Sequence, residues 1–376
     1  MNFAFSEEQE ELRQTVRRFL EDKSPSAEVR RLMETTEGYD EGVWKQMAQE
    51  LGLQSLHLPE AYGGQGFTFV ELAIVLEEMG RVLLCAPYFS TVVLAANAIM
   101  NVGTDEQQGT LLPGIASGET IATLAFTEPS GKWDASGITM EARQDGDGYV
   151  LDGTKMFVID GHTADLVVVV ARAAGTSGED GIGFFTVDGD AAGLTRTPLA
   201  TMDQTRKQAK LEFSGVKAQP LGAPGGGWAA LSKTLDQAAV GLSNEMVGGA
   251  QKVLDMSVEY AKVRVQFGRP IGSFQAIKHK CADMLLEVES AKSAAYYSAW
   301  AAAEDNEELP VVASLAKAYC SDAYFHAAAE NIQIHGGIGF TWEHDAHLYF
   351  KRAKSSEILL GDATYHRELL AQRIGI

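Results

Sequence analysis

Three segments of the chain combine polar side chains with glycine in patterns that suit the binding of a ligand. Residues 126–134 read Phe-Thr-Glu-Pro-Ser-Gly-Lys-Trp-Asp, a turn-rich stretch that follows a predicted strand. Residues 264–275 place two arginines and a glutamine beside glycines, and guanidinium and backbone donors suit a phosphate-bearing ligand. Residues 333–339 read Gln-Ile-His-Gly-Gly-Ile-Gly, which lets a ligand approach the backbone closely. Each segment alone is more often a plain turn, so it is their joint presence that indicates a site.

The motifs of several common enzyme classes are missing from the sequence. No Gly-x-Gly-x-x-Gly follows a predicted strand and no Walker-type loop occurs, so neither a Rossmann site nor a P-loop is supported. The Gly-x-Ser-x-Gly and His-Glu-x-x-His patterns are also absent. His344 and His347 lie three apart beside Glu343 and Asp345, but no third ligand is clustered with them. We therefore predict a solvated helix face there and no bound metal.

The charge balance limits the classes of partner. The 376 residues include 31 Lys and Arg against 51 Asp and Glu, a net charge of −20. This balance argues against a surface that binds nucleic acid or anionic lipid, although it does not exclude a local basic pocket. The hydrophobic residues, 45% of the chain, are enough to fill real cores, and the length predicts two or three domains.

The sequence also does not indicate a secretory signal, a membrane span or a cysteine pattern typical of disulfides or zinc. The first residues contain neither a basic n-region nor a long apolar stretch, and the longest uninterrupted apolar run, 166–171, is only as long as a strand. The three cysteines, Cys85, Cys281 and Cys320, are widely spaced, which favours neither a disulfide framework nor a thiolate zinc site. We therefore expect a cytoplasmic protein without membrane insertion.

The hydrophobic periodicity changes twice along the chain. Ser6, Thr68 and Thr104 each begin a capping-box pattern, which predicts helices in the first third. Alternation on both sides of a turn at residues 145–148 predicts a hairpin, and 165–171, 183–187 and 209–213 are further predicted strands. Helical spacing returns at 228–263, 273–304 and 310–330. We predict an α+β multidomain fold: a helical domain at 1–120, an antiparallel β domain at 121–226 and a helical bundle at 227–376.

The three segments, in this order on this architecture, resemble the acyl-CoA dehydrogenase family. The likeness extends over essentially the whole chain, and its most specific parts are Thr127-Glu-Pro, Arg264-x-x-Phe-Gly and Gln333-x-x-Gly-Gly-x-Gly. The resemblance implies a C-terminal four-helix domain and a tetrameric assembly. It also implies FAD-dependent α,β-desaturation of an acyl-CoA thioester, in which a carboxylate removes the α-proton and hydride leaves the β-carbon for flavin N5.

The resemblance assigns roles to individual residues. Thr127 and its neighbours are implied to contact the flavin ring or its ribityl chain. Arg264 is implied to reach the FAD of a neighbouring subunit, where its guanidinium can pair with the pyrophosphate; the alternative for Arg264 is a surface ion pair. The implied electron acceptor is an electron-transfer flavoprotein. The residues implied to bind FAD are Phe126, Thr127, Phe157, Ile159, Arg264, Phe267, Gln333, Gly336 and Gly337.

The chain departs from the family at the position of the catalytic base. The family usually places a Glu directly before the glycine that is Gly361 here, but this chain has Leu360. Leucine cannot accept a proton, so only its backbone N–H, which in the family helps to hold the thioester oxygen, is retained. Some members place the base on the first long C-terminal helix, where this chain has Ala238.

Glu245 is the carboxylate that we predict to be the base. It lies seven residues beyond Ala238, within about 20° of the same helix face. Gly241, Gly248 and Gly249 surround it, which suggests a close approach of a helix or a ligand. The alternative for Glu245 is a buried structural Glu that pairs with an arginine or caps a neighbouring helix. Asp362 is a weaker candidate for the base, and its alternative is a cap or a loop hydrogen bond.

Two further substitutions lie near the implied flavin. Ile159 replaces a threonine hydroxyl of the family, and Trp133 stands where a serine is usual. One hypothesis is a competent subunit, in a homotetramer, with Glu245 as base. The other is a non-catalytic partner in an α2β2 heterotetramer that completes the FAD site of a second chain, an arrangement found in members that act on bulky acyl groups such as steroid side chains. An acyl-CoA oxidase is a third, minor alternative, disfavoured because such chains are usually longer.

Overall fold

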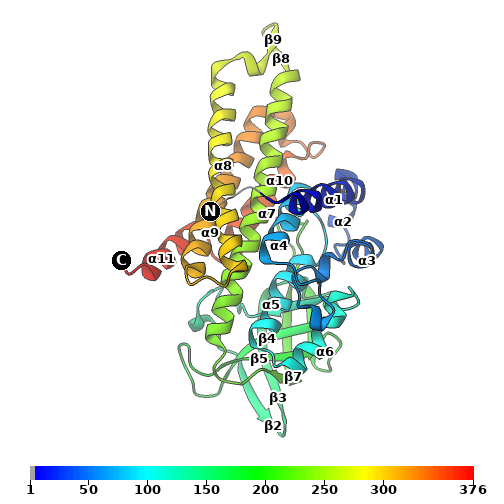
Figure 1. Cartoon of the computed structure of the whole chain (residues 1–376), viewed down its shortest axis with the longest axis vertical. Coiled ribbons are helices and arrows are strands. Elements are labelled where there is room, and N and C mark those ends of the chain that lie inside the picture. Colours follow the sequence, from blue (N-terminus) through cyan, green and yellow to red (C-terminus); the bar gives the residue numbers. More distant parts are fainter. Residues whose placement is uncertain (1–4) are drawn as a thin grey trace. The chain divides into compact units, whose positions relative to one another are not determined.

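The computed structural model describes residues 5–376, which form two compact units, each built from separated segments of the chain (Figure 1). The helical unit contains the described residues up to Arg30, together with Thr68–Leu84 and Ala239–Ile376. The β unit contains Arg31–Phe67 and Cys85–Ala238. The helical unit thus joins parts of the first and the last thirds of the sequence. The predicted boundaries at residues 120 and 226 stay a prediction.

The three predicted capping boxes are confirmed. The side chains of Ser6, Thr68 and Thr104 each cap a helix, and a Gln or Glu three residues on bonds back to the cap N–H in every case. This arrangement satisfies N–H groups that a helix start leaves without a partner. The helices of the first third are α1 (Glu7–Lys23), α2 (Ser26–Met33), α3 (Glu41–Gln49), α4 (Phe69–Arg81), α5 (Ala96–Val102) and α6 (Asp105–Ala116), with a π-helical segment at Phe89–Ala95.

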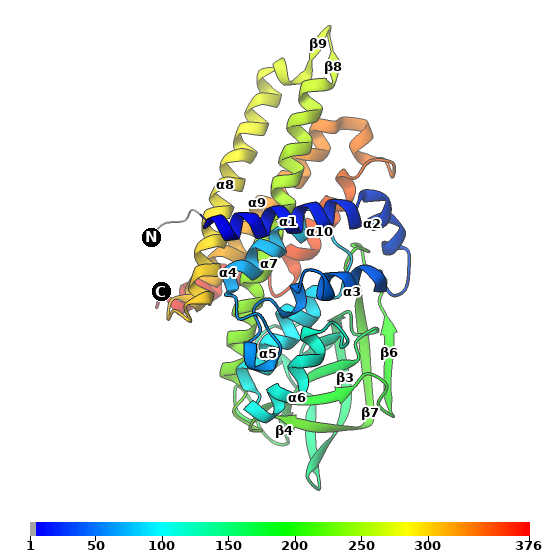
Figure 2. The ribbon, with the colours of Figure 1, turned by 45° about the vertical axis from the view of Figure 1, so that its right-hand side comes forward.

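The β unit contains a mostly antiparallel sheet, as predicted, and this sheet has seven strands. Its strand order is β1-β4-β2-β3-β7-β5, with β6 on β7, and a further β4–β5 pairing closes five strands into a ring. Only β1–β4 and β2–β4 are parallel. Figure 2 shows β3, β7 and β6 beside one another. The strands are β1 (Ala122–Ala125), β2 (Glu141–Asp145), β3 (Gly148–Ile159), β4 (Leu166–Ala173), β5 (Ile182–Asp188), β6 (Leu194–Pro198) and β7 (Gln208–Leu221).

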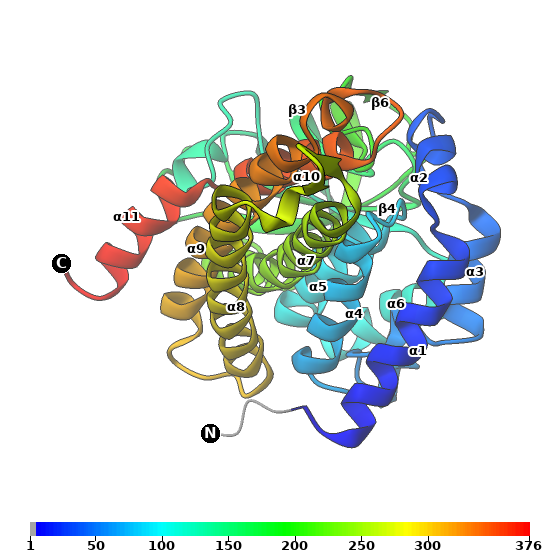
Figure 3. The ribbon, with the colours of Figure 1, turned by 90° about the horizontal axis from the view of Figure 1, so that it is seen from above.

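Long helices form most of the helical unit, and they lie close to their predicted ranges. Figure 3 shows α7 to α10 nearly end-on and side by side. A short β8–β9 hairpin joins α7 to α8 (Figure 1). Among residues 5–376, no helix has both the length and the apolar character needed to span a bilayer. The elements are α7 (Trp228–Val263), β8 (Val265–Gln266), β9 (Arg269–Pro270), α8 (Gln275–Ala303), α9 (Leu309–His335), α10 (Ala346–Ile358) and α11 (Ala363–Arg373).

Glycines allow the backbones of α4 and α7 to approach closely. A Cβ atom on Gly248 would lie 1.8 Å from the carbonyl oxygen of Glu77, and one on Gly80 would lie 2.0 Å from that of Glu245. Gly249 faces a side chain of α9 in the same way. Helix packing, one of the two explanations considered from the sequence, therefore explains Gly248 and Gly249.

Gly248→Ala should destabilise the protein because the added methyl group would overlap the carbonyl oxygen of Glu77. That oxygen belongs to the backbone of α4, so it can move only if the helix moves. We expect the free energy of unfolding to fall by about 3 kcal/mol. Gly109→Ala is the control: Gly109 is an exposed glycine of α6 whose added Cβ would make ordinary contact 3.8 Å from Tyr62. That variant should gain up to about 1 kcal/mol from helix propensity. Denaturant unfolding measures both, and equal values for the two variants would contradict the packing explanation.

Candidate active site

Strained backbone occurs at several of the positions to which the resemblance gives a role. Among residues 5–376, six non-glycine residues have a left-handed φ; three of these are positions given a role above, and a fourth directly follows Ile159. Such conformations cost about 1–3 kcal/mol each and persist only where the surroundings hold them, often at functional sites. The four are Phe157 (58°), Asp160 (52°), Phe267 (53°) and Leu360 (63°).

The β unit brings the Thr127 segment against the end of β3. The Met156 N–H donates to the carbonyl of Thr127 at 2.9 Å, which places Phe157 next to the Thr127 segment. Thr127 is buried, whereas 43% of Phe157 is exposed. Ile159 is buried and its carbonyl accepts from the Thr123 hydroxyl at 2.6 Å. The residues predicted to meet the flavin ring therefore lie on adjacent segments.

A buried ion pair fixes this arrangement. The Lys155 ammonium lies 2.8 Å from the Glu128 carboxylate and donates to the carbonyl of Phe126 at 3.3 Å. The carboxylate also accepts from the N–H groups of Thr139 and Met140, both at 2.9 Å. Burial lowers the pKa of Lys155 to about 8. Burial opposes ionisation of Glu128, but the ammonium and the N–H donors prevail and lower its pKa.

Trp133 contacts the same segment. Its ring lies 5.7 Å from the ring of Phe126, centroid to centroid, at an angle of 50°. Trp133 is half-buried, and the residues around it, 129–132, are exposed. The bulky side chain that replaces the usual serine is thus placed against Phe126.

In the helical unit, one stacked pair of rings joins the other two predicted segments. Tyr260 of α7 lies one turn before Arg264. Its ring stacks on that of His335, with the ring centroids 4.2 Å apart. His335 ends α9 and lies between Gln333 and Gly336. Nearby, the Ser257 hydroxyl donates to the Asn331 side chain at 2.9 Å. These contacts hold the C-terminal ends of α7 and α9 together.

The exposed polar groups at this place suit an anionic ligand. The Arg264 guanidinium is exposed and makes no ion pair or hydrogen bond with any residue of the range 5–376. The surface ion pair considered as its alternative is therefore absent there. The Gln333 amide is likewise exposed, and a Cβ on Gly336 or Gly337 would meet nothing within 4 Å. A free guanidinium, a free amide and open backbone fit the pyrophosphate and ribose of a dinucleotide.

The turn at Leu360 presents a backbone donor. Leu360 is 5% exposed, and its N–H has no acceptor within the described part of the chain. The Gly361 N–H donates to the carbonyl of Ile358 at 3.1 Å, and the carbonyl of Leu360 accepts from His366 Nε2 at 3.0 Å. Burial, reinforced by the charge of Lys317, lowers the pKa of His366 to about 3, so the ring is neutral.

Sequence reasoning missed a buried lysine beside this turn. Lys317 of α9 is completely buried, and its ammonium donates to the carbonyls of Glu357 and Gly361, both at 2.9 Å, and to the Ser321 hydroxyl at 3.1 Å. Burial lowers the pKa of Lys317 to about 7. A signal was available: a single lysine stands on an otherwise apolar face of α9, four residues after Ala313 and three before Cys320.

Glu245 is held in a buried ion pair. Its carboxylate lies 2.9 Å from Nη1 of Arg352 on α10, and 6% and 3% of the two residues are exposed. This pairing is the structural alternative considered from the sequence. The assignment of Glu245 as the base stays a prediction.

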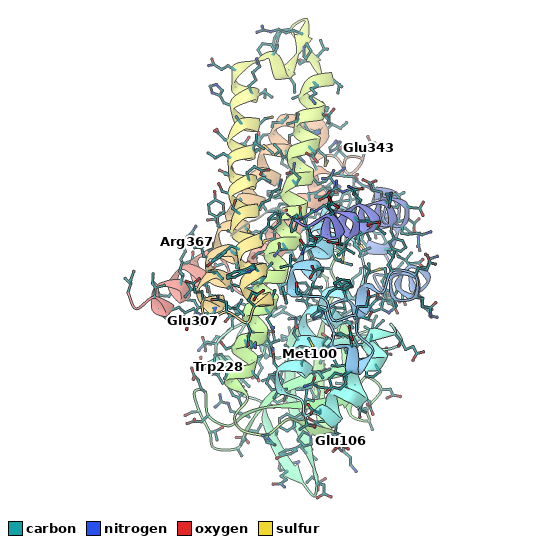
Figure 4. The ribbon with its side chains drawn as sticks, viewed as in Figure 1. Met100, Glu106, Trp228, Glu307, Glu343 and Arg367 are labelled. Atoms are coloured by element: carbon teal, nitrogen blue, oxygen red, sulfur yellow. The ribbon has the colours of Figure 1, made fainter. Side chains whose placement is uncertain are left out.

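The remaining candidates have structural contacts. Asp362 is exposed and caps α11 by accepting from the Tyr365 N–H at 2.8 Å, so its assignment as a base also stays a prediction. Glu343 lies at the edge of the helical unit (Figure 4). Over residues 5–376, no group of three or more His, Cys, Asp or Glu side chains is arranged to hold a metal ion.

Comparison with known families identifies the chain. Three family models match, described as the N-terminal, middle and C-terminal domains of acyl-CoA dehydrogenase, over residues 6–119, 123–216 and 225–375. The chain belongs to the acyl-CoA dehydrogenase family. Members of this family are in general FAD-dependent flavoproteins, and the predicted order of a helical, a β and a helical domain is confirmed.

Individual relatives agree with the family assignment. The acyl-CoA dehydrogenase IpdE2 of Mycobacterium tuberculosis is 37% identical over 94% of this chain and 93% of the relative. The steroid ACAD Tcur3481-Tcur3483 covers 98% of both chains at 34% identity, with a TM-score of 0.88. The ChsE4-ChsE5 complex of M. tuberculosis covers 100% of this chain and 99% of its own at 28% identity, with a TM-score of 0.90.

The buried ammonium of Lys317 should make stability depend on pH. Its pKa falls from 10.5 to about 7 on folding, so between these values the unfolded chain binds the proton more tightly. The stability contributed by Lys317 is therefore present above pH 10.5 and is lost as the pH falls toward 7. From pH 7.5 to 9.5, wild type should gain about 2 kcal/mol relative to Lys317→Met, by denaturant unfolding. A constant difference would show that the lysine keeps its ordinary pKa.

Proposed function

We propose that the protein takes part in FAD-dependent α,β-desaturation of an acyl-CoA thioester. The observation that carries this proposal is the Leu360 turn, which offers an N–H without a partner at the position where the family holds the thioester oxygen. A fixed backbone donor stabilises charge that develops on a carbonyl oxygen when an α-proton is removed. When bound, FAD supplies the acceptor for the hydride that leaves the β-carbon.

Two sets of residues are proposed to hold FAD. In the β unit, Phe126, Thr127, Phe157 and Ile159 would contact the flavin ring, because the Lys155–Glu128 pair holds their segments together. In the helical unit, the exposed guanidinium and open glycines would bind the pyrophosphate and ribose of the FAD of a neighbouring subunit. The residues of this second set are Arg264, Phe267, Gln333, Gly336 and Gly337.

We propose that a second acyl-CoA dehydrogenase chain supplies the base in an α2β2 heterotetramer. Leu360 cannot accept a proton, and the Glu245 carboxylate is engaged by Arg352 in a buried pair. A carboxylate held in this way is not free to approach a substrate carbon. The relatives named Tcur3481-Tcur3483 and ChsE4-ChsE5 are each named for two chains, which supports the proposal.

Glu245 as the base of a self-sufficient homotetramer is the second candidate. Its buried place on α7, close to the helix position used by some family members, favours it. The two candidates differ in whether this chain alone desaturates a substrate.

The substrate class that we propose is a bulky acyl-CoA, such as one with a steroid side chain. The name of the steroid ACAD relative supports this class. Trp133, in contact with Phe126, indicates that the site differs in shape from those with serine at this position. An electron-transfer flavoprotein is the proposed electron acceptor.

Expression of the full chain with and without a second acyl-CoA dehydrogenase chain tests the proposal. We expect the chain alone to be inactive and poor in FAD, by its visible spectrum, and to gain both FAD and desaturase activity in the complex. Activity of the chain alone would contradict the heterotetramer proposal. If neither preparation desaturates any acyl-CoA, the proposed function itself is wrong.

Glu245→Gln separates the two candidates. If the Arg352 pair is structural, the variant should lose about 3–5 kcal/mol of stability, because a buried guanidinium then lacks its counter-charge. The complex should nevertheless keep its kcat at permissive temperature. Asp255→Asn is the matched control, since Asp255 on α7 pairs with Arg81 at 2.9 Å but is 40% exposed. It should cost about 1 kcal/mol at most. A loss of kcat of about 1,000-fold or more in a stable Glu245→Gln protein would establish Glu245 as the base.

A further inference from the structure

Both carbonyl oxygens of the Leu360–Gly361 turn are held by buried basic side chains from two different helices. His366 of α11 donates to the carbonyl of Leu360 at 3.0 Å, and Lys317 of α9 donates to that of Gly361 at 2.9 Å. Lys317 is 0% exposed and His366 is 3% exposed. We call these two residues the turn clamp.

One of the three hydrogen bonds of the Lys317 ammonium reaches this turn, and the other two go to α9 and α10. Lys317 lies near the carboxylates of Glu357, Asp362 and Asp322, but its hydrogen bonds are with backbone carbonyls and one hydroxyl. A buried ammonium without an ion-pair partner costs free energy unless acceptors surround it. The carbonyls of Glu357 and Gly361 and the Ser321 hydroxyl are those acceptors.

Contacts from outside the turn must stabilise it because the backbone of Leu360 is strained. Its φ of 63° is a left-handed conformation, which costs a residue with a Cβ about 1–2 kcal/mol. In this conformation the Leu360 N–H leaves the hydrogen-bond ladder of α10 and finds no other acceptor in residues 5–376. The clamp acts on the carbonyls and leaves this N–H available.

We propose, on the basis of the proposed function, that Lys317 and His366 are positioning residues that hold the Leu360 N–H in place for the thioester oxygen. Neither side chain touches the substrate in this proposal. Each acts through a carbonyl of the turn, so loss of either would let the turn relax and move the donor. The Leu360 N–H would then no longer polarise the thioester carbonyl. This role needs only the backbone, so it does not depend on a carboxylate at position 360.

Paired ligands distinguish positioning from mere support of the fold. Octanoyl-CoA and the thioether S-octyl-CoA differ only in the carbonyl oxygen that the Leu360 N–H would bind. We measure their affinities by calorimetry for the FAD-loaded protein, in complex with the second chain where FAD binding requires it. Wild type should bind the thioester more tightly than the thioether.

Lys317→Met should lower the ratio of the two affinities about tenfold while leaving the affinity for S-octyl-CoA nearly unchanged, because a misplaced donor affects only the thioester. His366→Leu should act in the same direction, and His366→Gln, which keeps a side-chain N–H donor, should recover part of the ratio. Cys320→Ala is the control, since Cys320 is buried on α9 but contacts the Ala291 carbonyl of α8. It should leave the ratio unchanged.

Two contrary outcomes have different meanings. If Lys317→Met and His366→Leu weaken both ligands equally, the residues only support the fold and the inference is wrong. The His366 variants give this answer even if Lys317→Met does not fold. If wild type binds both ligands with equal affinity, the proposed role of the Leu360 N–H is wrong, and the inference falls with it.

Discussion

A positive charge removed from water must be surrounded by acceptors, and this requirement determines the shape of both candidate site segments. In the β unit, the Lys155 ammonium pairs with the Glu128 carboxylate and donates to the carbonyl of Phe126. In the helical unit, the Lys317 ammonium donates to the carbonyls of Glu357 and Gly361. In each unit a strained residue, Phe157 or Leu360, lies within a few residues of a group so held. The acceptors offset part of the cost of burying each ammonium, and the same contacts hold the backbone near the strained residue in place.

This chain keeps the turn at Leu360 but has no carboxylate there, so two roles that one family residue usually combines are separated. In the family the residue before this glycine both removes a proton and presents its N–H. Here the side chain is apolar while the backbone conformation is maintained by contacts from α9 and α11.

Features that depend on neighbours in the sequence could be predicted, and those that depend on distant contacts could not. The caps at Ser6, Thr68 and Thr104 and the β2–β3 hairpin follow from local hydrogen bonding and alternation, and all were found. The motif segments were located, but the Tyr260–His335 stack that joins two of them spans 75 positions of sequence. The partner of Glu245 is 107 residues away, so an ion pair and a free base looked alike. Lys317 was detectable only as a lysine on an apolar helix face, because its acceptors, the carbonyls of Glu357 and Gly361, lie 40 and 44 residues away in the sequence.

The helical unit combines the start of the chain with its end, which constrains the order of folding during synthesis. Helices α1 and α4 emerge from the ribosome long before α7, whose backbone α4 packs against through Gly80 and Gly248. The face of α4 that packs on α7 is therefore left uncovered until about 160 further residues, including the larger segment of the β unit, Cys85–Ala238, have been synthesised. The β unit can fold in this interval, whereas the early helices are exposed to association with other nascent chains. Chaperone demand should accordingly be greatest while the β unit is complete and α7 is still inside the ribosome.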